Sequence, residues 1–340
     1  MKNFVHTALF ALILILAAGC WRRPLYDMDD KIAFKVTVDV DTVANIKANI
    51  YNEQLEKPST NTDVLRVMAY DPSNHILITQ GFLSEKSYDA AGHQVFDGTL
   101  HIAQGNFDFL IYNAFDAPSI TWKDENNIDN ILANTASGTK AEDSKVYDRP
   151  DHLMVARLKN YRIAPHDEVM GVSATAYTCI NTYYIQIRVD GLQYVSSATA
   201  TVSGLYSGNY FGRDKDQNIG IGERVSDPLA SVTFRMEKST DKHIAGENKD
   251  VLCALFNTFG KVRDMNSNFD LTITDTGGNT LQYSYSLNLT FRTEDAIERH
   301  WLLLDDIVVV PNPRPVPPVD NGGFKPQVDD WEVQHGEITL

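Results

Sequence analysis

Cys20 is the residue whose position in this sequence most clearly indicates chemistry. Lys2 gives the chain a positive start, an apolar run covers residues 8–18, and the small residues Ala-Ala-Gly directly precede the cysteine. This is the pattern of an export signal that is cleaved before Cys20. A thiol at that point can accept a diacylglycerol group, and the freed amine can accept a further acyl chain. The run is too short for a membrane-spanning helix, which needs about 20 apolar residues.

The five residues Leu16 to Cys20 are typical of a lipobox with one departure. The commonest pattern has Leu three residues before the cysteine, where this sequence has Ala17. An ordinary signal peptide with a structural Cys20 is therefore the alternative. Each buried acyl CH2 contributes about 0.8 kcal/mol, so two or three chains hold a protein stably on a bilayer.

The best approach to a metal motif is "DKDQNIGIGE", where Asp214, Asp216 and Asn218 have the spacing of a calcium loop. The glycine comes one place late, as Gly220, and Val225 stands where a closing glutamate is needed. An ordinary turn explains these residues better. We expect no metal ion and no other cofactor.

The remaining cysteines and the motif search give no sign of an active site. Cys179 and Cys253 lie in no CxxC or zinc-like spacing, so we expect two buried thiols, with one disulfide left open. The G-x-S-x-G, P-loop, G-x-G-x-x-G and H-E-x-x-H patterns do not occur. We expect no enzymatic activity, and a hydrolase built on two carboxylates is a minor alternative.

The charge balance excludes one class of partner. The chain has 45 acidic and 30 basic residues and a net charge of -15, with no basic run beyond Arg22-Arg23. A nucleic-acid-binding protein would carry a basic patch, so we expect no nucleic-acid partner.

The elements that must carry these residues are mostly strands. Apolar residues alternate with polar ones at Ile32, Phe34, Val36, Val38 and Val40, which predicts a half-buried strand. The same alternation recurs in "NFDFLIYNAF", "NTYYIQIRVDGL", "FDLTITD" and "LQYSYSLNLTF", where the last run places Leu281 to Phe291 on one face. "DTGGN" predicts a hairpin turn at Gly277 and Gly278. Such short strands favour antiparallel sandwiches.

One helix is expected, over "ENNIDNILANT", within a polar segment from Lys123 to Asp151. We expect that segment to be an exposed excursion on the first domain. The segment "PNPRPVPPVDNGG" further along is rich in proline and predicts an extended spacer.

Several stretches in order along the chain together resemble one known family. They are "CWRRPLYDMDD", "KIAFKVTVD", "VLRVMAYD", "NTYYIQIRVDGL", "VSGLYSGNYFGRD" and "GGFKPQVDDWE". Together they resemble the FimB family of fimbrial anchor lipoproteins of type V pili. The resemblance implies an all-β fold with two tandem transthyretin-like antiparallel β-sandwich domains after a lipoprotein signal peptide. It also implies a role in anchoring a fimbrium to the outer membrane, with fimbrillin subunits as partners and an effect on fimbrial assembly or length.

The expected organisation follows from these patterns. Residues 1–19 form the signal peptide, 20–30 a lipidated lead-out, 31–170 the first sandwich domain, 171–310 the second, and 311–340 a spacer and strand-like tail. Cys20 is the expected lipidation site, which places the protein on the outer membrane, exposed at the cell surface.

The tail is the candidate for partner binding. Its apolar residues Phe324, Val328, Trp331 and Val333 could add as a strand to a partner's sheet. Equally, the tail could pack on its own second domain as an edge strand.

A surface glycan-binding lipoprotein is the alternative function. Its candidate stacking residues are Trp122, Tyr147, Tyr206, Tyr210 and Phe211, although aromatic residues in such contexts more often pack within loops.

Overall fold

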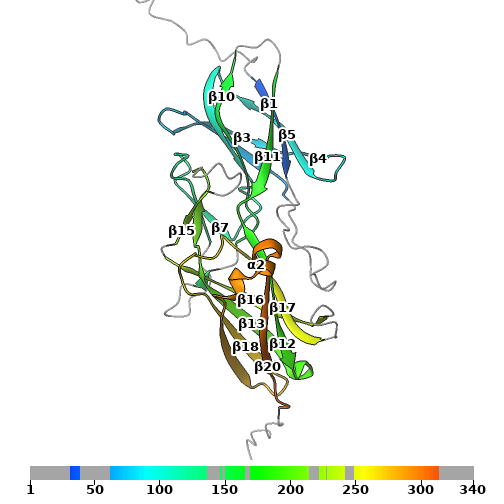
Figure 1. Ribbon diagram of the computed structural model, residues 1–340. Helices are drawn as coiled ribbons and strands as arrows, with labels where there is room; N and C mark the ends of the chain where they lie inside the picture. Colours follow the sequence, from blue (N-terminus) through cyan, green and yellow to red (C-terminus); the bar gives the residue numbers. More distant parts are fainter. Residues whose placement is uncertain are drawn as a thin grey trace, which may run out of the picture.

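The computed structural model describes residues 31–38, 62–135, 146–147, 150–164, 169–213, 222–226, 228–241 and 249–313. Within these ranges the chain is nearly all β, with a single α-helix and two short 3-10 turns. The strands form three sheets, stacked one after another along the long direction of the molecule (Figure 1). The expectation of an all-β fold is confirmed.

The first sheet contains eight strands in the order β3-β2-β6-β10-β11-β1-β5-β4. We call this unit the N-terminal sandwich. Its strands are β1 (Lys31–Val38), β2 (Leu65–Tyr70), β3 (Leu77–Leu83), β4 (Glu85–Tyr88), β5 (Gln94–His101), β6 (Gly105–Tyr112), β10 (Met154–Ile163) and β11 (Met170–Thr178).

The strand β1 shows why this sequence folds as it does. Its alternating residues Ile32, Phe34 and Val36 are almost fully buried in the core of the N-terminal sandwich. Phe34 packs edge-on against Phe109 of β6, with ring centroids 5.2 Å apart. β1 pairs in parallel with β11 and antiparallel with β5, so it lies in the interior of the sheet. The predicted period-two strand is confirmed here.

The second large sheet forms what we call the C-terminal sandwich, in the order β19-β18-β13-β16-β17-β12-β20. Its strands are β12 (Asn181–Asp190), β13 (Val195–Leu205), β16 (Ala230–Asp241), β17 (Lys249–Thr258), β18 (Asn268–Asp275), β19 (Thr280–Ser286) and β20 (Trp301–Val309). The two-residue β9 (Val146–Tyr147) pairs with β16. The turn η1 (Leu192–Tyr194) follows β12, and η2 (Thr290–Arg292) and α2 (Glu294–Arg299) precede β20.

The hairpin between β18 and β19 follows the sequence prediction. Gly278 has a φ of 83°, a left-handed conformation that glycine adopts without strain. The carboxylate of Asp275 accepts hydrogen bonds from the backbone N–H groups of Gly277 and Asn279, both at 2.8 Å. These bonds lower the pKa of Asp275, the largest effect being the bond from the Asn279 side chain.

A third, four-stranded sheet lies between the two sandwiches (Figure 1). Its strands are β7 (Ile120–Lys123), β8 (Leu132–Thr135), β14 (Gly208–Tyr210) and β15 (Glu223–Val225), in the order β15-β14-β8-β7. β8 lies within the predicted excursion, β7 ends at its first residue, Lys123, and β14 and β15 come from the second half of the chain. The central pair is β8 with β14, so backbone hydrogen bonds join the two halves directly.

The helix expected over "ENNIDNILANT" is a wrong prediction. Residues 124–130 form turns and β8 follows at Leu132. Ile128 and Ile131 are buried, so this part of the expected excursion is interior. Their spacing of three resembles a helix face, but the Asn127 side chain accepts a hydrogen bond from the N–H of Asp129, which favours a turn.

The strand β11 covers Met170–Thr178 and pairs with β1 and β10 of the N-terminal sandwich. It begins where the first domain was expected to end, at residue 170. The division into 31–170 and 171–310, the transthyretin-like character and the count of two domains stay predictions.

The two ends of the described body lie at opposite poles. β1 begins beside Met170, at the end of β11 that is far from Cys179 and the junction. β20 ends beside Asp190, at the far end of β12. The chain therefore enters the body at one pole and leaves it at the other (Figure 1).

Candidate functional site at the junction of the two sandwiches

The predicted site residues lie outside the part of the chain that the structure describes. This holds for Cys20, for Phe324, Val328, Trp331 and Val333 of the tail, and for the calcium candidates Asp214, Asp216 and Asn218. Within the described ranges, no group of three or more His, Cys, Asp or Glu residues could hold a metal ion. No helix in those ranges is long and apolar enough to cross a membrane.

The most developed arrangement of side chains is the junction between the two sandwiches. A single apolar cluster there draws residues from both halves of the chain. Met68, Leu110 and Leu153 come from the first half, and Ile180, Phe211 and Phe259 from the second. Only Cys179 and Ile180 separate β11 from β12. The two sandwiches are therefore packed against each other with almost no linker.

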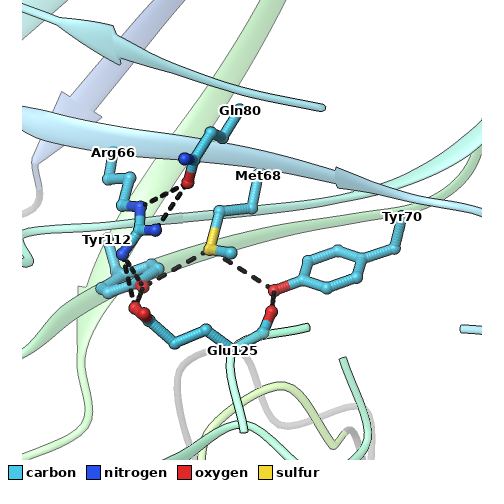
Figure 2. A network of polar contacts seen from close by, with 6 residues as sticks. All are labelled: Arg66, Met68, Tyr70, Gln80, Tyr112 and Glu125. Carbon is cyan, nitrogen blue, oxygen red and sulfur yellow. Dashed lines mark hydrogen bonds and ion pairs between the residues drawn. The ribbon is translucent and has the colours of Figure 1, made fainter. Parts of the chain in front are cut away.

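Residues 124–131, which we call the clasp loop, carry the polar part of this junction. The Glu125 carboxylate lies between the Arg66 guanidinium and the Tyr112 hydroxyl (Figure 2). Arg66 Nη1 donates to Oε1 of Glu125 at 2.5 Å, and the Tyr112 hydroxyl donates to the same oxygen at 2.7 Å. The backbone carbonyl of Glu125 accepts the hydroxyl hydrogen of Tyr70 at 2.9 Å. Three side chains of the N-terminal sandwich thus bind one residue of the loop.

The alternation of β2 explains how these groups come together. Leu65, Val67 and Ala69 face the core of the N-terminal sandwich. Arg66, Met68 and Tyr70 must then face the other side, toward the junction (Figure 2). Gln80 of β3 accepts two hydrogen bonds from Arg66, which orients its guanidinium.

Burial governs the protonation of the two tyrosines. Desolvation raises the pKa of Tyr70 and of Tyr112 far above the ordinary value, and the nearby Glu125 carboxylate adds to the effect in both. Both hydroxyls therefore stay protonated and act as hydrogen-bond donors. These groups hold the loop in place and are unsuited to proton transfer.

The clasp loop is also bound on its other side. His75 pairs with the Asp129 carboxylate, and its backbone carbonyl accepts the N–H of Ile128 at 3.0 Å. Arg213, which follows β14, donates to the backbone carbonyl of Asp129 at 2.5 Å and pairs with Glu223 at 2.7 Å. The loop thereby connects the turn after β2 to the β14–β15 hairpin.

A second cross-link lies nearby. The guanidinium of Arg157 on β10 donates two hydrogen bonds to the backbone carbonyl of Phe211. Cys179 is buried in the junction cluster and Cys253 in a separate cluster with Tyr184 and Trp301, and no disulfide joins them. Burial raises the pKa of the Cys179 thiol to about 11, so it stays protonated.

Of the aromatic residues considered for glycan stacking, Phe211 is buried and Trp122, Tyr206 and Tyr210 are partly exposed. Phe211 is fully buried, and its ring centroid lies 5.0 Å from that of Tyr112. Trp122 packs on the same two rings. The guanidinium carbon of Arg213 lies 4.0 Å from the centroid of the Tyr210 ring, and the guanidinium of Arg224 lies over the ring of Tyr206. Phe211, Trp122 and Tyr206 thus pack in the junction cluster, and glycan binding stays a prediction.

Sequence reasoning missed the clasp loop because its partners are far apart in the chain. Arg66 and Glu125 are separated by 59 positions, and Arg213 and Asp129 by 84. The available signal was the density of Asn and Asp between Asp124 and Asn130, which is typical of turns.

Comparison with known proteins gives a match to a family model and several similar folds. Residues 59–220 match a family described as a domain of unknown function, DUF5119. No curated protein matches.

Among solved structures, a candidate adhesin from Bacteroides ovatus has a TM-score of 0.50 and 17% identity, covering 87% of this chain and 98% of its own. The fimbrial anchor protein Mfa2 from Porphyromonas gingivalis has a TM-score of 0.45 and 12% identity, covering 82% of this chain and 90% of its own. At these identities the likeness concerns the fold, which the chain shares with the Bacteroides ovatus protein over 87% of its length.

Proposed function

We propose that this chain is a lipid-anchored subunit that holds a fimbrium at the outer membrane. In this proposal Cys20 carries the lipid, the body stands at the cell surface, and the tail beyond Pro313 contacts fimbrillin subunits. The role is structural, with no enzymatic activity, and it extends to the assembly or length of the fimbrium.

The placement of the two chain ends carries the proposal. An anchor must bind the membrane at one end and its cargo at the other. The described body starts at Lys31 at one pole and ends at Pro313 at the opposite pole. Pro313 lies against Gly277 of the β18–β19 hairpin, so the described chain ends at the pole opposite Lys31.

The junction supports the same role. The apolar cluster, the clasp loop and the Arg157 cross-link fix one sandwich on the other. A rigid body keeps the partner-binding end at a set distance from the membrane. The fold shared with a candidate adhesin agrees with a role at the cell surface.

The proposal is tested with a Cys20→Ala strain, and Trp21→Ala serves as the matched control because it leaves the acceptor thiol in place. The Cys20→Ala protein should fold, since the cores begin at Ile32, but should leave the membrane fraction together with its fimbriae. Labelled palmitate should enter the control and not the variant. Normal surface fimbriae on Cys20→Ala cells would contradict the proposal.

A further inference from the structure

The strands at which the described body begins and ends are each paired in parallel with a strand that leads to the junction. β1 is parallel to β11, and β20 is parallel to β12. Among the described residues, the other strand pairs of the two sandwiches are antiparallel, apart from the short β9 beside β16. The two parallel pairs therefore involve the strands to which a force on the two chain ends would be applied.

Consider first the N-terminal pair. Seven residue pairs join β1 to β11, from Ile32 opposite Met170 to Val38 opposite Ala176. A pull on the preceding chain draws β1 outward by its first residue. A pull from the junction draws β11 the opposite way by its last residue, Thr178. The two strands would have to slide past each other along their length.

The C-terminal pair repeats this geometry. Seven residue pairs join β12 to β20, from Tyr184 opposite Trp301 to Asp190 opposite Val309. The junction pulls β12 by its first residue, Asn181, and the tail pulls β20 by its last. Load again acts along the strands.

Two further bonds lengthen the second ladder. Tyr184 N–H donates to the carbonyl of His300 at 2.9 Å, and Val310 N–H donates to the carbonyl of Asp190 at 2.8 Å. A register shift between Ile187 and Arg188 places Asp305 and Asp306 outside the pairing, and Arg188 bonds to the carbonyl of Asp305 there. The first ladder has no such shift.

We propose that the chain is a two-stage shear clamp, which resists tension applied between its N-terminal and C-terminal ends. Because lateral bonds hold β1 to β11 and β20 to β12, a force applied at the two chain ends acts across each ladder. In shear, all bonds of a ladder carry load together and must fail together. In unzipping, the same bonds open one pair at a time, and each contributes only about 1 kcal/mol net.

β1 is further secured because it also pairs with β5 over eight positions, from Lys31 opposite His101 to Val38 opposite Gln94. β12 is likewise flanked on its other side by β17. Between the two ladders, the covalent chain through Cys179 and Ile180 carries load beside the apolar cluster and the other contacts of the junction. The shear geometry belongs to the fold itself, while its use under tension rests on the proposed anchoring function.

Single-molecule force spectroscopy tests the clamp by changing only the direction of pull. The mature chain carries handles at its two termini in the first case. In the second, the C-terminal handle moves to Val169, which is exposed and adjoins the start of β11. In the third, the N-terminal handle moves to Gln193, which is exposed and follows the end of β12. Denaturant unfolding of each version checks that the handles leave its stability unchanged.

End-to-end pulling should show two unfolding steps, each adding roughly 400–500 Å of contour length at about 3.5 Å per residue. The Val169 and Gln193 geometries should open the same ladders at about half the force or less, since bonds fail singly. Equal forces in the shear and unzipping geometries would overturn the clamp. Because this experiment uses the purified chain, its failure would leave the anchoring proposal, tested by Cys20→Ala, unaffected.

Discussion

Tyr283 donates its hydroxyl hydrogen to the backbone carbonyl of Val309 at 2.7 Å. This bond links β19 and β20, the two strands at opposite ends of the C-terminal sheet order, so the sheet nearly closes on itself. The ring of Tyr283 also stacks on that of Tyr285, with centroids 6.5 Å apart.

The Tyr283→Phe variant should lose about 1 kcal/mol of unfolding free energy, the net value of one hydrogen bond. The ring and its stacking remain, so the loss isolates the hydroxyl. Urea unfolding measures it, with Tyr285→Phe as the matched control. A Tyr283→Phe protein as stable as the wild type would show that this bond does not hold the two edges together.

The ion pair of the clasp loop should be measurable by a double-mutant cycle. Arg66→Met and Glu125→Gln should each destabilise the protein, and their coupling should be about 0.5–2 kcal/mol. The side chains of Arg66 and Glu125 are 17% and 31% exposed, so the coupling should weaken as salt is added. Purely additive effects at low salt would exclude a direct role for the pair.

His300 should make stability depend on pH. Burial lowers the pKa of His300, although the hydrogen bond to the Thr182 carbonyl opposes this, and Arg224 lowers it further. The folded state then binds a proton less readily than the unfolded state, whose His pKa is about 6.5. This contribution to stability is present above that value and is lost as pH falls below it.

His300→Asn is the appropriate variant, because Asn tolerates the left-handed φ of 54° at this helix end. Urea unfolding at about pH 7.5 and about pH 5, on either side of the unfolded-state pKa, should show a smaller loss of stability on acidification in the variant. An identical loss in both proteins would assign the pH dependence to other groups.

Two glycines offer a matched pair for backbone crowding. Gly191 and Gly278 have similar positive φ values of 90° and 83°. A Cβ at Gly191 would lie 2.1 Å from the carbonyl oxygen of Val310, whereas a Cβ at Gly278 meets open space. Gly278→Ala should cost about 1 kcal/mol from the backbone alone.

Gly191→Ala should cost about 2 kcal/mol more, because the end of β20 must shift to make room. Thermal and urea unfolding measure both variants. Similar losses of unfolding free energy in the two variants would show that Val310 moves away from the added methyl group at little cost.

The tail can be removed without touching the described body. A chain that ends at Pro313 keeps the packed Val310 and the contact with Gly277. We expect it to be folded, lipidated and at the surface, yet unable to co-purify with fimbrillin. Alanine replacement of Phe324 and Trp331 in the full-length tail should act in the same direction. Normal co-purification of the truncated chain would move the joining surface to the body or assign the tail to its own sheet.

The sequence pattern was sufficient for single strands and local turns. Alternation alone located β1 and β12, and the glycines of "DTGGN" located the β18–β19 hairpin. These features depend on neighbours two to four residues away, which the sequence displays directly.

Features that depend on residues far apart in the chain could not be predicted from the sequence. The run from Leu281 was expected to continue to Phe291 on one face, but β19 ends at Ser286. Leu287 instead donates its N–H to the carbonyl of Ser267, and η2 follows. Likewise, nothing near β1 reveals that its parallel partner is β11, because parallel pairing depends on the path of the whole intervening chain.

The direct passage from β11 through Cys179 and Ile180 into β12 also bears on how such a protein can evolve. A segment beginning at Asn181 would carry Phe211 and Phe259 without the apolar residues that cover them. It would also leave β14 without β8. We therefore expect that exchanging, duplicating or recombining one sandwich alone would expose this apolar surface, so that the two are best treated as one unit.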